Sequence, residues 1–575
     1  MPFLAEEFID VPNKDLLSWM FDDQQYDPDR PVTLLPHWDA SDTFEQIYVD
    51  AAEPSRTISS RQARSIIRKL CAGFNAIGLK SGDCVCMLSF NDIYYPMAFL
   101  GIVAFGGIFA GSNPSHTPYE LAHAFRIAEV KAMIVEKELV PNALKAAKEV
   151  GIPSSHIFVF DHHTPLNIPF SLGEFDGIKS WRSLMQHGES DWERWDDEKR
   201  SKETTAARLF SSGTTGLPKA VEMTHYNFVA QHTMVIEYKP RDYEIVRLLC
   251  TPMFHVSNVP RAHTSPMRGG LQTYVMRRFE LESWLRNIER FQITEGNLNP
   301  PMVVQIINSH LTKKYSLKSI RNAWTGAAPL AAEPQARFKA LLRPDAPFNQ
   351  VWGMSETSCI ATMLHYPEHD PTGSVGLFLP NLDSKLVDDE GQDITDYDVV
   401  GELCVRGPLI VKGYYNNPEA NKASWDEDGY FHTGDIAVRK RENGLWYIVD
   451  RKKELIKVRG FQVAPAELEG VLLGHAEISD AAVIGVSAAG PGSSQDAFKG
   501  ASEQGSELPR AYLVRKSGSR LEEKDVNAYM RERLAGYKQL AGGVVFLDAI
   551  PKNASGKILK KELRDMAKRE MRARL

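Results

Sequence analysis

The feature that most constrains the fold is an alternation of amphipathic helical patterns with short apolar runs. The segment "SRQARSIIRKLCAGFNAIGL" (60–79) repeats apolar residues at helical spacing, and the strand-like run "DCVCMLSF" (83–90) follows it. Similar apolar runs return in "VKAMIVE" (130–136) and in "GLQTYVM" (270–276). A repeated order of helix and strand is typical of parallel sheets covered by helices. The sequence therefore predicts layers of α/β structure, and it shows no fixed-period repeat.

The second half of the chain carries a different pattern. The segments "GELCVRGPLIVKGYYNNPE" (401–419) and "NGLWYIVDRKKELIKVRG" (443–460) are rich in β-forming residues and turns, which predicts a small β-region. The part of the chain beyond them has the size of a separate domain. We therefore predict an α/β protein with two domains. Residues 1–450 form a large N-terminal domain of layered α/β subdomains plus the small β-region, and residues 451–575 form a small α+β C-terminal domain.

Composition excludes several classes of protein. The 67 Lys and Arg residues against 74 Asp and Glu residues give a net charge of −7, which argues against a nucleic-acid partner. Six scattered cysteines without zinc-ligand spacing predict reduced core thiols in a soluble, intracellular protein. The opening "MPFLAEEFIDVP" lacks the basic start of a signal peptide. The longest apolar run (96–111) is too short and too rich in glycine for a transmembrane segment, and it is predicted as a buried helix leading into a strand.

Two polar stretches interrupt these patterns. The charged segment 187–206 predicts an exposed connection. The segment 487–507 is rich in Gly, Ser and Ala and poor in large apolar residues, which predicts a mobile loop.

The stretch "LFSSGTTGLPKAV" (209–221) has the composition of a phosphate-binding loop. A turn rich in glycine and hydroxyl groups that leaves a strand can point backbone N–H groups at an anion, and Lys219 adds a mobile positive charge. It is not a Walker A loop, because Gly213 and Gly216 are too close together and Pro218 precedes the lysine. The alternative is a flexible surface loop with a chance lysine.

A second stretch, "NQVWGMSETS" (349–358), combines an aromatic ring, a glycine and a carboxylate. Trp352 offers a flat face for a purine, Gly353 allows a close approach of the backbone, and Glu356 offers a hard oxygen for Mg²⁺. The alternative is a turn beside a core tryptophan.

Two further stretches lie near the predicted domain boundary. "YFHTGD" ends in Asp435, which could accept hydrogen bonds from ribose hydroxyls or cap a turn. "DRKKELIKVRGFQVAPAELE" (450–469) gathers basic residues where a hinge would lie, and Pro465 suits the first turn of a helix. The alternative for the basic run is a solvated face.

Three shorter features complete the set. "IPKNASGKILKKEL" (550–563) presents Lys557 on a Ser-Gly turn, where it either enters a site formed elsewhere or stays an ordinary surface lysine. "TPMFHVSNV" (251–259) puts His255 at the end of an apolar strand, where a structural histidine is the alternative. "TGAAPL" (325–330) is a turn of small residues.

Taken in order, these motifs resemble those of the adenylate-forming superfamily, which comprises acyl-CoA synthetases, luciferases and the adenylation domains of peptide synthetases. SSGTTGLPK, FHV, TGAAPL, WGMSE, YFHTGD, DRKKELIKVRGFQVAPAELE and PKNASGK occur in the family's order over roughly residues 55–565. "GFQVAPAELE" and "PKNASGKILKKEL" are most similar to the branch of 4-coumarate–CoA ligase and luciferase.

The resemblance implies a two-step reaction that uses ATP, Mg²⁺ and CoA. A carboxylate attacks the α-phosphate of ATP to give an acyl-adenylate and pyrophosphate, and the thiol of CoA then displaces AMP. One alternative is a stand-alone adenylating enzyme that loads a carrier-protein thiol. Another is a non-catalytic nucleotide-binding scaffold, and a luciferase-type oxidative second step has no positive sign in the sequence.

The resemblance also assigns nucleotide-binding residues. The residues implied to cradle the β- and γ-phosphates are Ser211, Ser212, Gly213, Thr214, Thr215 and Lys219. The residues implied to surround adenine and the α-phosphate are Gln350, Val351, Trp352, Gly353 and Ser355. Glu356 would hold Mg²⁺, and Asp435 and Arg451 would fix the ribose.

The remaining roles concern catalysis and the second step. Lys557 would bridge the carboxylate and the α-phosphate, and Lys453 would be the hinge of a domain rotation that withdraws it. The residues implied to approach the site after rotation, or to meet CoA, are Lys457, Arg459, Gly460, Gln462 and Arg278. His255 would gate the acyl pocket, whose implied lining is His255, Val256, Gly326, Ala327 and Ala328.

The sequence departs from the family pattern in several places. Trp352 replaces the usual tyrosine and Ser355 the usual threonine, and both keep the ring face or the hydroxyl. After His255 the family has an apolar or aromatic pocket helix, whereas here the polar residues are Asn258, Arg261, His263, Thr264 and Arg268. They predict a pocket with polar groups for a functionalised acid, and the alternative is that they face solvent or a subunit contact.

The last residues end in Ala-Arg-Leu, which resembles the S-K-L peroxisomal address. We expect recognition by a peroxisomal import receptor. The alternative is an ordinary basic amphipathic helix in a cytoplasmic protein.

Overall fold

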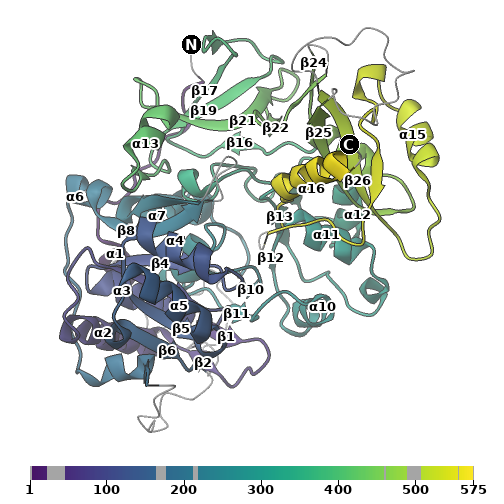
Figure 1. The fold of residues 1–575 in the computed structure, drawn as a ribbon. Coiled ribbons are helices and arrows are strands. Elements are labelled where there is room, and N and C mark those ends of the chain that lie inside the picture. The colour runs from purple at the N-terminus through teal and green to yellow at the C-terminus, as the bar shows by residue number, and fades with distance from the viewer. Residues whose placement is uncertain are drawn as a thin grey trace.

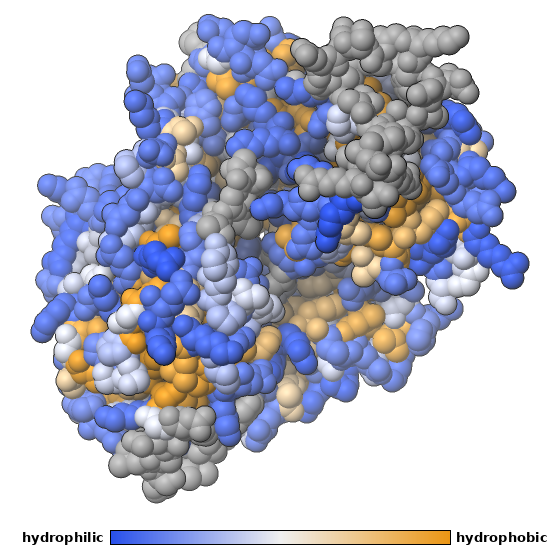
Figure 2. Space-filling model, in the orientation of Figure 1, coloured by the Kyte–Doolittle hydropathy of each residue, from blue (hydrophilic) through white to orange (hydrophobic). Residues whose placement is uncertain are grey.

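The computed structural model describes residues 3–22, 46–162, 177–211, 218–458, 461–487, 507–553 and 556–573. Two large sheets covered by helices form the bigger part of the molecule, and a β-region and a C-terminal unit, green and yellow in Figure 1, lie above them. The surface is mostly hydrophilic on the face shown in Figure 2, and it is hollowed between the larger part and the C-terminal unit.

The first sheet has eight strands in the order β20-β9-β8-β4-β3-β5-β6-β7. The strands from β8 to β7 in this order run parallel, whereas β8 and β9 form an antiparallel hairpin. The bounds are β3 (Cys84–Leu88), β4 (Ile108–Ser112), β5 (Val130–Glu136), β6 (Ile157–Phe160), β7 (Lys179–Ser180), β8 (Thr205–Ser211), β9 (Lys219–Thr224) and β20 (Gly413–Tyr414).

The second sheet has seven strands in the order β14-β13-β12-β10-β11-β1-β2. All neighbours are parallel except β1 and β2, which confirms the predicted parallel layers. The bounds are β1 (Tyr48–Asp50), β2 (Thr57–Ile58), β10 (Arg247–Leu249), β11 (Thr273–Val275), β12 (Glu295–Leu298), β13 (Asn322–Thr325) and β14 (Phe348–Gln350).

Helix starts and burial follow from local sequence. Helix α2 (Ser60–Ala76) begins with a capping box between Ser59 and Gln62. Helix α3 (Tyr95–Ala104) is apolar on every side and buried along its whole length, as expected for the run that leads into β4. The other helices of the larger part are α1 (Leu16–Phe21), α4 (Pro118–Ala128), α5 (Val140–Val150), α6 (Glu198–Glu203), α7 (His225–His232), α8 (Val259–His263), α9 (Ser265–Gly269), α10 (Leu281–Arg290), α11 (Pro300–Ile307), α12 (Ala332–Leu341) and α13 (Pro418–Ser424).

The predicted β-region is a five-stranded antiparallel sheet in the order β18-β17-β19-β21-β22. Its bounds are β17 (Asp383–Val387), β18 (Asp393–Ile394), β19 (Gly401–Arg406), β21 (Phe431–Arg439) and β22 (Trp446–Arg451). A separate pair, β15 (Thr362–Met363) and β16 (Leu377–Phe378), precedes it.

The C-terminal unit has its own hydrophobic cores, formed by residues between Ile456 and Ala567. Pro465 occupies the first turn of α14, as predicted. The boundary between residues 450 and 451 stays a prediction. The elements are β23 (Ile456–Val458), β24 (Phe461–Val463), α14 (Pro465–Leu473), β25 (Ile478–Ser487), β26 (Glu507–Arg515), α15 (Glu523–Arg531), β27 (Val544–Phe546) and α16 (Lys560–Ala573).

The expected exposed connection at 187–206 is wrong in part. Trp192 within it is 4% exposed, and its indole Nε1 donates to Ser18 Oγ at 3.2 Å. The Arg194 guanidinium lies 4.8 Å from the centroid of the same ring. The apolar area that the Trp192 side chain buries holds this charged stretch against the rest of the protein.

Other expectations concern cysteines, membranes and segments outside the described residues. All six cysteines are buried free thiols, as predicted. Within the described part of the chain, no helix has the length and apolar character needed to cross a membrane. The predicted mobile loop at 487–507 falls almost entirely outside the described residues, as do Arg574 and Leu575 of the C-terminal tripeptide.

Candidate active site

Side chains from distant parts of the chain meet at a cavity of about 380 Å³. Strands β12, β13 and β14 lie side by side in parallel, and residues that follow them line the cavity, among them Asn299, Gly326 and Val351. The carboxyl ends of parallel strands are where ligands bind in open α/β sheets. The β8–β9 hairpin, the β21–β22 pair and the C-terminal residue Lys557 supply further walls.

The hairpin that carries the predicted phosphate loop opens onto this cavity. Ser211 ends β8 and Lys219 begins β9, the two are paired across the hairpin, and both line the cavity. Burial lowers the pKa of Lys219, which nearby Glu356 partly opposes. The Lys219 Nζ lies 4.2 Å from the centroid of the Tyr414 ring. Residues 212–217 between the two strands lie outside the described residues, and they include Ser212, Gly213, Thr214 and Thr215.

Glu356 is the carboxylate best placed for a cation. It is 4% exposed, lines the cavity and accepts a hydrogen bond from the Tyr414 hydroxyl to its Oε1 at 2.8 Å. Within the described ranges, no group of three or more His, Cys, Asp or Glu side chains could hold a metal on its own. A single carboxylate fits Mg²⁺, because this ion is usually held by one or two carboxylates together with water and substrate phosphates.

A second cavity of about 890 Å³ lies between the larger part and the C-terminal unit. Gln350 and Trp352 of the predicted adenine site, together with Asp435, line this second cavity. The residues common to both cavities are Ala327, Val351, Gly353, Arg451 and Lys557. The two spaces therefore adjoin where the nucleotide is expected.

Asp435 ties this junction together. It lies inside β21 and is paired with Arg451 of β22, so it is a strand residue and not a turn cap. Arg451 Nε lies 2.5 Å from Asp435 Oδ1, and Trp352 Nε1 donates to Asp435 Oδ2 at 2.8 Å. The tryptophan that replaces the usual tyrosine is thus held by the carboxylate predicted to bind ribose.

Two residues of the "NQVWG" stretch shape the backbone around the cavities. A Cβ at Gly353 would lie 1.6 Å from the Cys359 carbonyl oxygen, so only glycine fits there. The Gln350 side chain donates to the Leu330 carbonyl at 2.8 Å and accepts from the Leu330 N–H at 3.0 Å. It therefore fixes the small-residue turn at 326–330, in which Ala327 has a φ of 72°.

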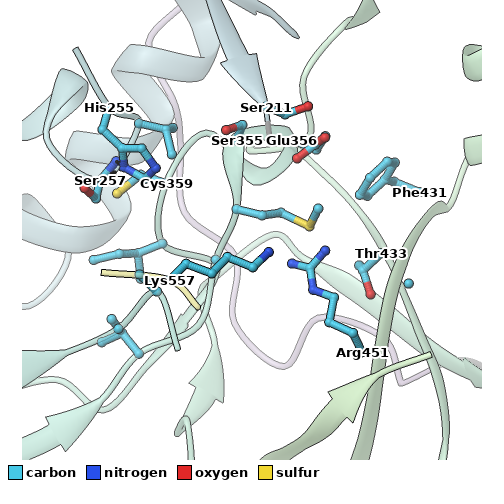
Figure 3. A pocket seen from close by; sticks show the side chains of 18 of the residues that line it. Ser211, His255, Ser257, Ser355, Glu356, Cys359, Phe431, Thr433, Arg451 and Lys557 are labelled. Atoms are coloured by element: carbon cyan, nitrogen blue, oxygen red, sulfur yellow. Dashed lines mark hydrogen bonds between the residues drawn. The ribbon is translucent and has the colours of Figure 1, made fainter. Parts of the chain in front are cut away.

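Lys557 reaches the cavity from the C-terminal unit. Figure 3 shows its side chain extended toward the Arg451 guanidinium, with His255, Ser257 and Cys359 to one side. Burial and the neighbouring Arg451 lower the pKa of Lys557. The preceding turn is docked tightly, because a Cβ at Gly556 would lie 2.9 Å from Pro301 Cγ.

The acyl side of the cavity is built around His255. Strand β10 ends at Leu249, so His255 lies in the turn after the strand. His255 Nδ1 lies 2.9 Å from Ser257 Oγ and accepts from the Ser257 N–H at 3.2 Å. Val256, Gly326 and Ala327 line the cavity with it, whereas Ala328 lines the second cavity only.

The polar residues after His255 are all buried, which excludes the alternative that they face solvent or a subunit contact. Only one of them, Arg261, lines the cavity. His263 stacks against Tyr95 and Phe99 in the core. The others bond to protein groups, Asn258 to Thr251, Thr264 to the Pro260 carbonyl and Arg268 to Glu237.

Several predicted residues lie elsewhere. Ser355 and the predicted hinge residue Lys453 line the first cavity. Arg278 and Lys457, expected to meet CoA, are exposed and line neither cavity in this arrangement. Arg459 and Gly460 fall outside the described residues, and only the backbone of Gln462 is described, in β24.

Residues 38–415 match the family model of the AMP-binding enzyme, and residues 467–557 match that of the AMP-binding enzyme C-terminal domain. The chain belongs to the AMP-binding enzyme family. This confirms the predicted superfamily.

Curated relatives of this AMP-binding enzyme cover nearly its whole length. The phenylacetyl-CoA ligase epaB of Aspergillus niger is 47% identical over 98% of this chain and 99% of its own. The acyl-CoA synthetase ACTT5 of Alternaria alternata is 50% identical over 91% of this chain and 88% of its own. The anthranilate CoA ligase AuaEII, solved with anthranoyl-AMP, superposes with a TM-score of 0.81 at 22% identity, covering 99% of both chains. The predicted α/β fold class, with a large N-terminal and a small C-terminal domain, is confirmed.

Reasoning from the sequence missed several residues of this AMP-binding enzyme's cavity. Tyr414 contacts both Lys219 and Glu356, yet nothing in the sequence distinguishes it from the neighbouring Tyr415. Trp324 and Cys359 also line the cavity, and each follows or precedes a quoted motif by a few positions. Proximity to a motif was the only signal that could have found them.

The neutrality of His255 leads to a testable pH dependence. Burial, assisted by Lys557, lowers the pKa of His255 to about 4, so the ring carries its charge only below that pH. The ratio of the wild-type rate to the His255→Gln rate is expected to stay constant between pH 6 and 8. Measuring thioester formation by both enzymes over this range checks it. A ratio that changes near pH 6.5, the ordinary pKa of histidine, would contradict a neutral His255 ring.

Proposed function

We propose that this cavity activates a carboxylic acid with ATP to an acyl-adenylate, releases pyrophosphate and then transfers the acyl group to CoA. The chain is an AMP-forming acyl-CoA ligase, because relatives with acyl-CoA ligase and synthetase names share 47–50% of its sequence over most of its length. The observation that carries the residue roles is the meeting of Lys557, Arg451 and Glu356 in one cavity.

The first role is to hold the polyphosphate of ATP. Ser211, Lys219 and the loop between them surround the β- and γ-phosphates in this proposal, since both strand ends open onto the cavity. Glu356 would hold Mg²⁺, which when bound neutralises charge on the phosphate oxygens. The Tyr414 hydroxyl orients that carboxylate. Asp435 and Arg451, which are paired with each other, bind the ribose in this proposal.

The second role is to stabilise the transition state of adenylation. A carboxylate oxygen of the acid attacks the α-phosphorus, and the bond from that phosphorus to the oxygen bridging to the β-phosphate breaks. Negative charge is concentrated between the acid and the α-phosphate as this happens. Lys557 directs a positive charge at this point, and the Arg451 guanidinium, which is paired with Asp435, lies beside it in the same cavity.

The third role belongs to the thiol step. The CoA thiol loses its proton and attacks the acyl carbonyl carbon, and AMP leaves with the electrons of the acyl–phosphate bond. Lys557 forms part of one wall of the cavity, so in this proposal the thiol step follows a movement of the C-terminal unit. Lys453 is the proposed hinge. Lys457, Arg459, Gly460, Gln462 and Arg278 are the proposed residues for CoA.

A reversible crosslink tests this movement. A Cβ at Gly470 of α14 would lie 3.4 Å from Ala331 Cβ at the start of α12, close to the ~3.5–4.5 Å of disulfides. In the double variant Ala331→Cys and Gly470→Cys, oxidation is expected to leave acyl-adenylate formation intact and to lower thioester formation at least ~10-fold. Mass spectrometry of both products, before and after reduction, measures the two steps.

The two single cysteine variants are the matched controls, because neither can form the crosslink. The six native thiols are buried and add little background. Equal loss of both steps on oxidation, or full thioester formation by the crosslinked protein, would count against the movement.

The reaction itself is tested by ATP-dependent thioester formation with aromatic, medium-chain, long-chain and hydroxylated acids, with and without CoA. A CoA thioester from one class establishes the proposal and gives the substrate class. An acyl-adenylate that accumulates while CoA stays unused indicates a carrier-protein thiol as acceptor. ATP binding without pyrophosphate release above background indicates a non-catalytic scaffold.

Import into peroxisomes through the terminal Ala-Arg-Leu is a further part of the proposal. Basic residues of α16 precede this tripeptide, which is similar to the S-K-L address. A fluorescent protein fused to the N-terminus leaves the tripeptide free, and fusion to the C-terminus masks it. Identical distribution of the two fusions in cells would reject the address.

A further inference from the structure

One guanidinium in the acyl wall of the cavity has buried N–H groups with no hydrogen-bond partner among the described residues. Arg261 of α8 lines the cavity although it is 4% exposed. Its Cζ lies 4.8 Å from the centroid of the Trp324 ring, which lines the same wall. Among the described residues, Arg261 Nε and Nη1 are buried without a hydrogen-bond partner. Burying N–H groups of a charged side chain without an acceptor costs free energy, so a hydrogen-bond acceptor is missing at this position.

The charges near Arg261 make the shortage larger. The Glu295 carboxylate is fully buried and pairs with Arg241 at 3.3 Å and with Arg247 at 3.1 Å. Arg261 interacts electrostatically with all three of these groups. Three buried guanidiniums therefore share one carboxylate, and the cluster has a surplus of positive charge.

Among the described residues, Cys359 is the other acidic group that acts on Arg261, and it does not supply the missing negative charge. Burial raises the pKa of the neighbouring Cys359 thiol to about 12, so the thiol is neutral at neutral pH. Burial and the nearby Arg247 lower the pKa of Arg261 only to about 10, so the guanidinium keeps its charge. The open side of Arg261 is the cavity.

We propose that the acid activated here carries a second carboxylate at the end away from the reacting carboxyl group, and that Arg261 binds it. The inference rests on the proposed function, because it assigns this part of the cavity to the acyl group. A carboxylate supplies the acceptors that the guanidinium lacks and balances part of the surplus charge. The apolar stem of the acid would pack against the Trp324 ring and Val256 on the way.

The test uses pairs of non-hydrolysable acyl-sulfamoyl-adenosines that differ only in a terminal carboxylate or methyl group, over a series of aliphatic and aromatic stems. For the best stem, the carboxylate analogue is expected to bind the wild-type enzyme about 10- to 100-fold tighter than its methyl twin. In Arg261→Met this ratio is expected to fall to about one or below, since Met keeps an unbranched apolar stem and removes the charge. Calorimetry measures both affinities.

Arg286→Met is the matched control, because Arg286 is exposed on α10 and lines neither cavity, and it should keep the wild-type ratio. A wild-type enzyme that prefers every methyl twin, or a ratio that Arg261→Met leaves unchanged, overturns the inference. If Arg261→Met fails to fold, Arg261→Lys keeps a charge without the planar donor set, and its ratio is expected to fall below that of the wild type.

The inference and the proposed function fail in different ways. Binding of the analogues is independent of turnover, whereas thioester formation requires both chemical steps. Discrimination between the twins without any thioester product contradicts the proposed function and leaves the second-carboxylate site standing. Thioester formation from monocarboxylic acids without discrimination between the twins contradicts the site alone.

Discussion

Lys557→Met is expected to lower the rate of acyl-adenylate formation by about 10²–10³-fold, the usual cost of removing one preorganised charge from a transition state. Lys557 reaches the first cavity from the C-terminal unit, and its lowered pKa reflects the burial that strengthens its field. Met keeps an unbranched apolar stem, one atom shorter than that of Lys, and removes the charge. Pyrophosphate release with a saturating acid measures the effect.

Lys561→Met is the control for this variant. Lys561 is exposed on α16, so the same charge is lost four residues away without a change in the cavity. Because Lys557 leaves the site before the thiol step in the proposed mechanism, acyl-adenylate supplied from outside should still give thioester with CoA. A loss below about tenfold in pyrophosphate release would remove Lys557 from the catalytic groups.

Glu295→Gln is expected to destabilise the larger part of the molecule by about 3–5 kcal/mol, the cost of leaving buried charges without their partner. Arg247 lies opposite Glu295 across β10 and β12, and both side chains are at most 1% exposed. Without the carboxylate, the positive charges of Arg241, Arg247 and Arg261 repel one another while the three side chains stay almost fully buried. Urea denaturation of the variant and the wild type measures the difference.

The pH dependence of this difference follows from the pKa of Glu295. Burial acts to raise it, but Arg247, Arg241 and Arg261 outweigh burial and hold it below its ordinary value of 4.5. A group with a lowered folded pKa stabilises fully above its unfolded pKa and loses that contribution as pH falls through the folded pKa. The gap between wild type and Glu295→Gln should therefore narrow below pH 4.5.

Glu333→Gln provides the matched control, because it breaks the ion pair to Arg337 on the exposed surface of α12. Such pairs contribute little, so its denaturation midpoint should stay close to that of the wild type. Equal midpoints for Glu295→Gln and Glu333→Gln would contradict the prediction, because they would mean that the buried arginines do not depend on Glu295 for their charge balance.

Patterning predicted the parts of the fold whose signal is local. The apolar run at 96–111 became α3 and β4, since a helix that is apolar all round has no place except the interior. The prediction that 187–206 is exposed was wrong in part. It rested on the composition of the whole stretch, whereas the single buried indole of Trp192 holds the stretch against the surface. The placement of β1 between β11 and β2 had no sequence signal, because it depends on contacts between distant segments.

The candidate site shows a similar division. Ordered motifs led to Lys219, Glu356, Arg451 and Lys557, and the fold brings all four to one cavity. The sequence could not show which residue of a short helix faces that cavity. Arg261 and His263 are two positions apart in α8, so their side chains point about 200° apart, and only packing decides that Arg261 lines the cavity.

The burial of Cys359 has a consequence for the fidelity of this chemistry. An acyl-adenylate is a strong acylating agent, and any thiolate in reach could capture the acyl group permanently. Cys359 lines the same cavity, yet its pKa of about 12 leaves almost no thiolate at neutral pH. An enzyme whose second substrate is a thiol thus protects itself from self-acylation by keeping its own nearest thiol protonated.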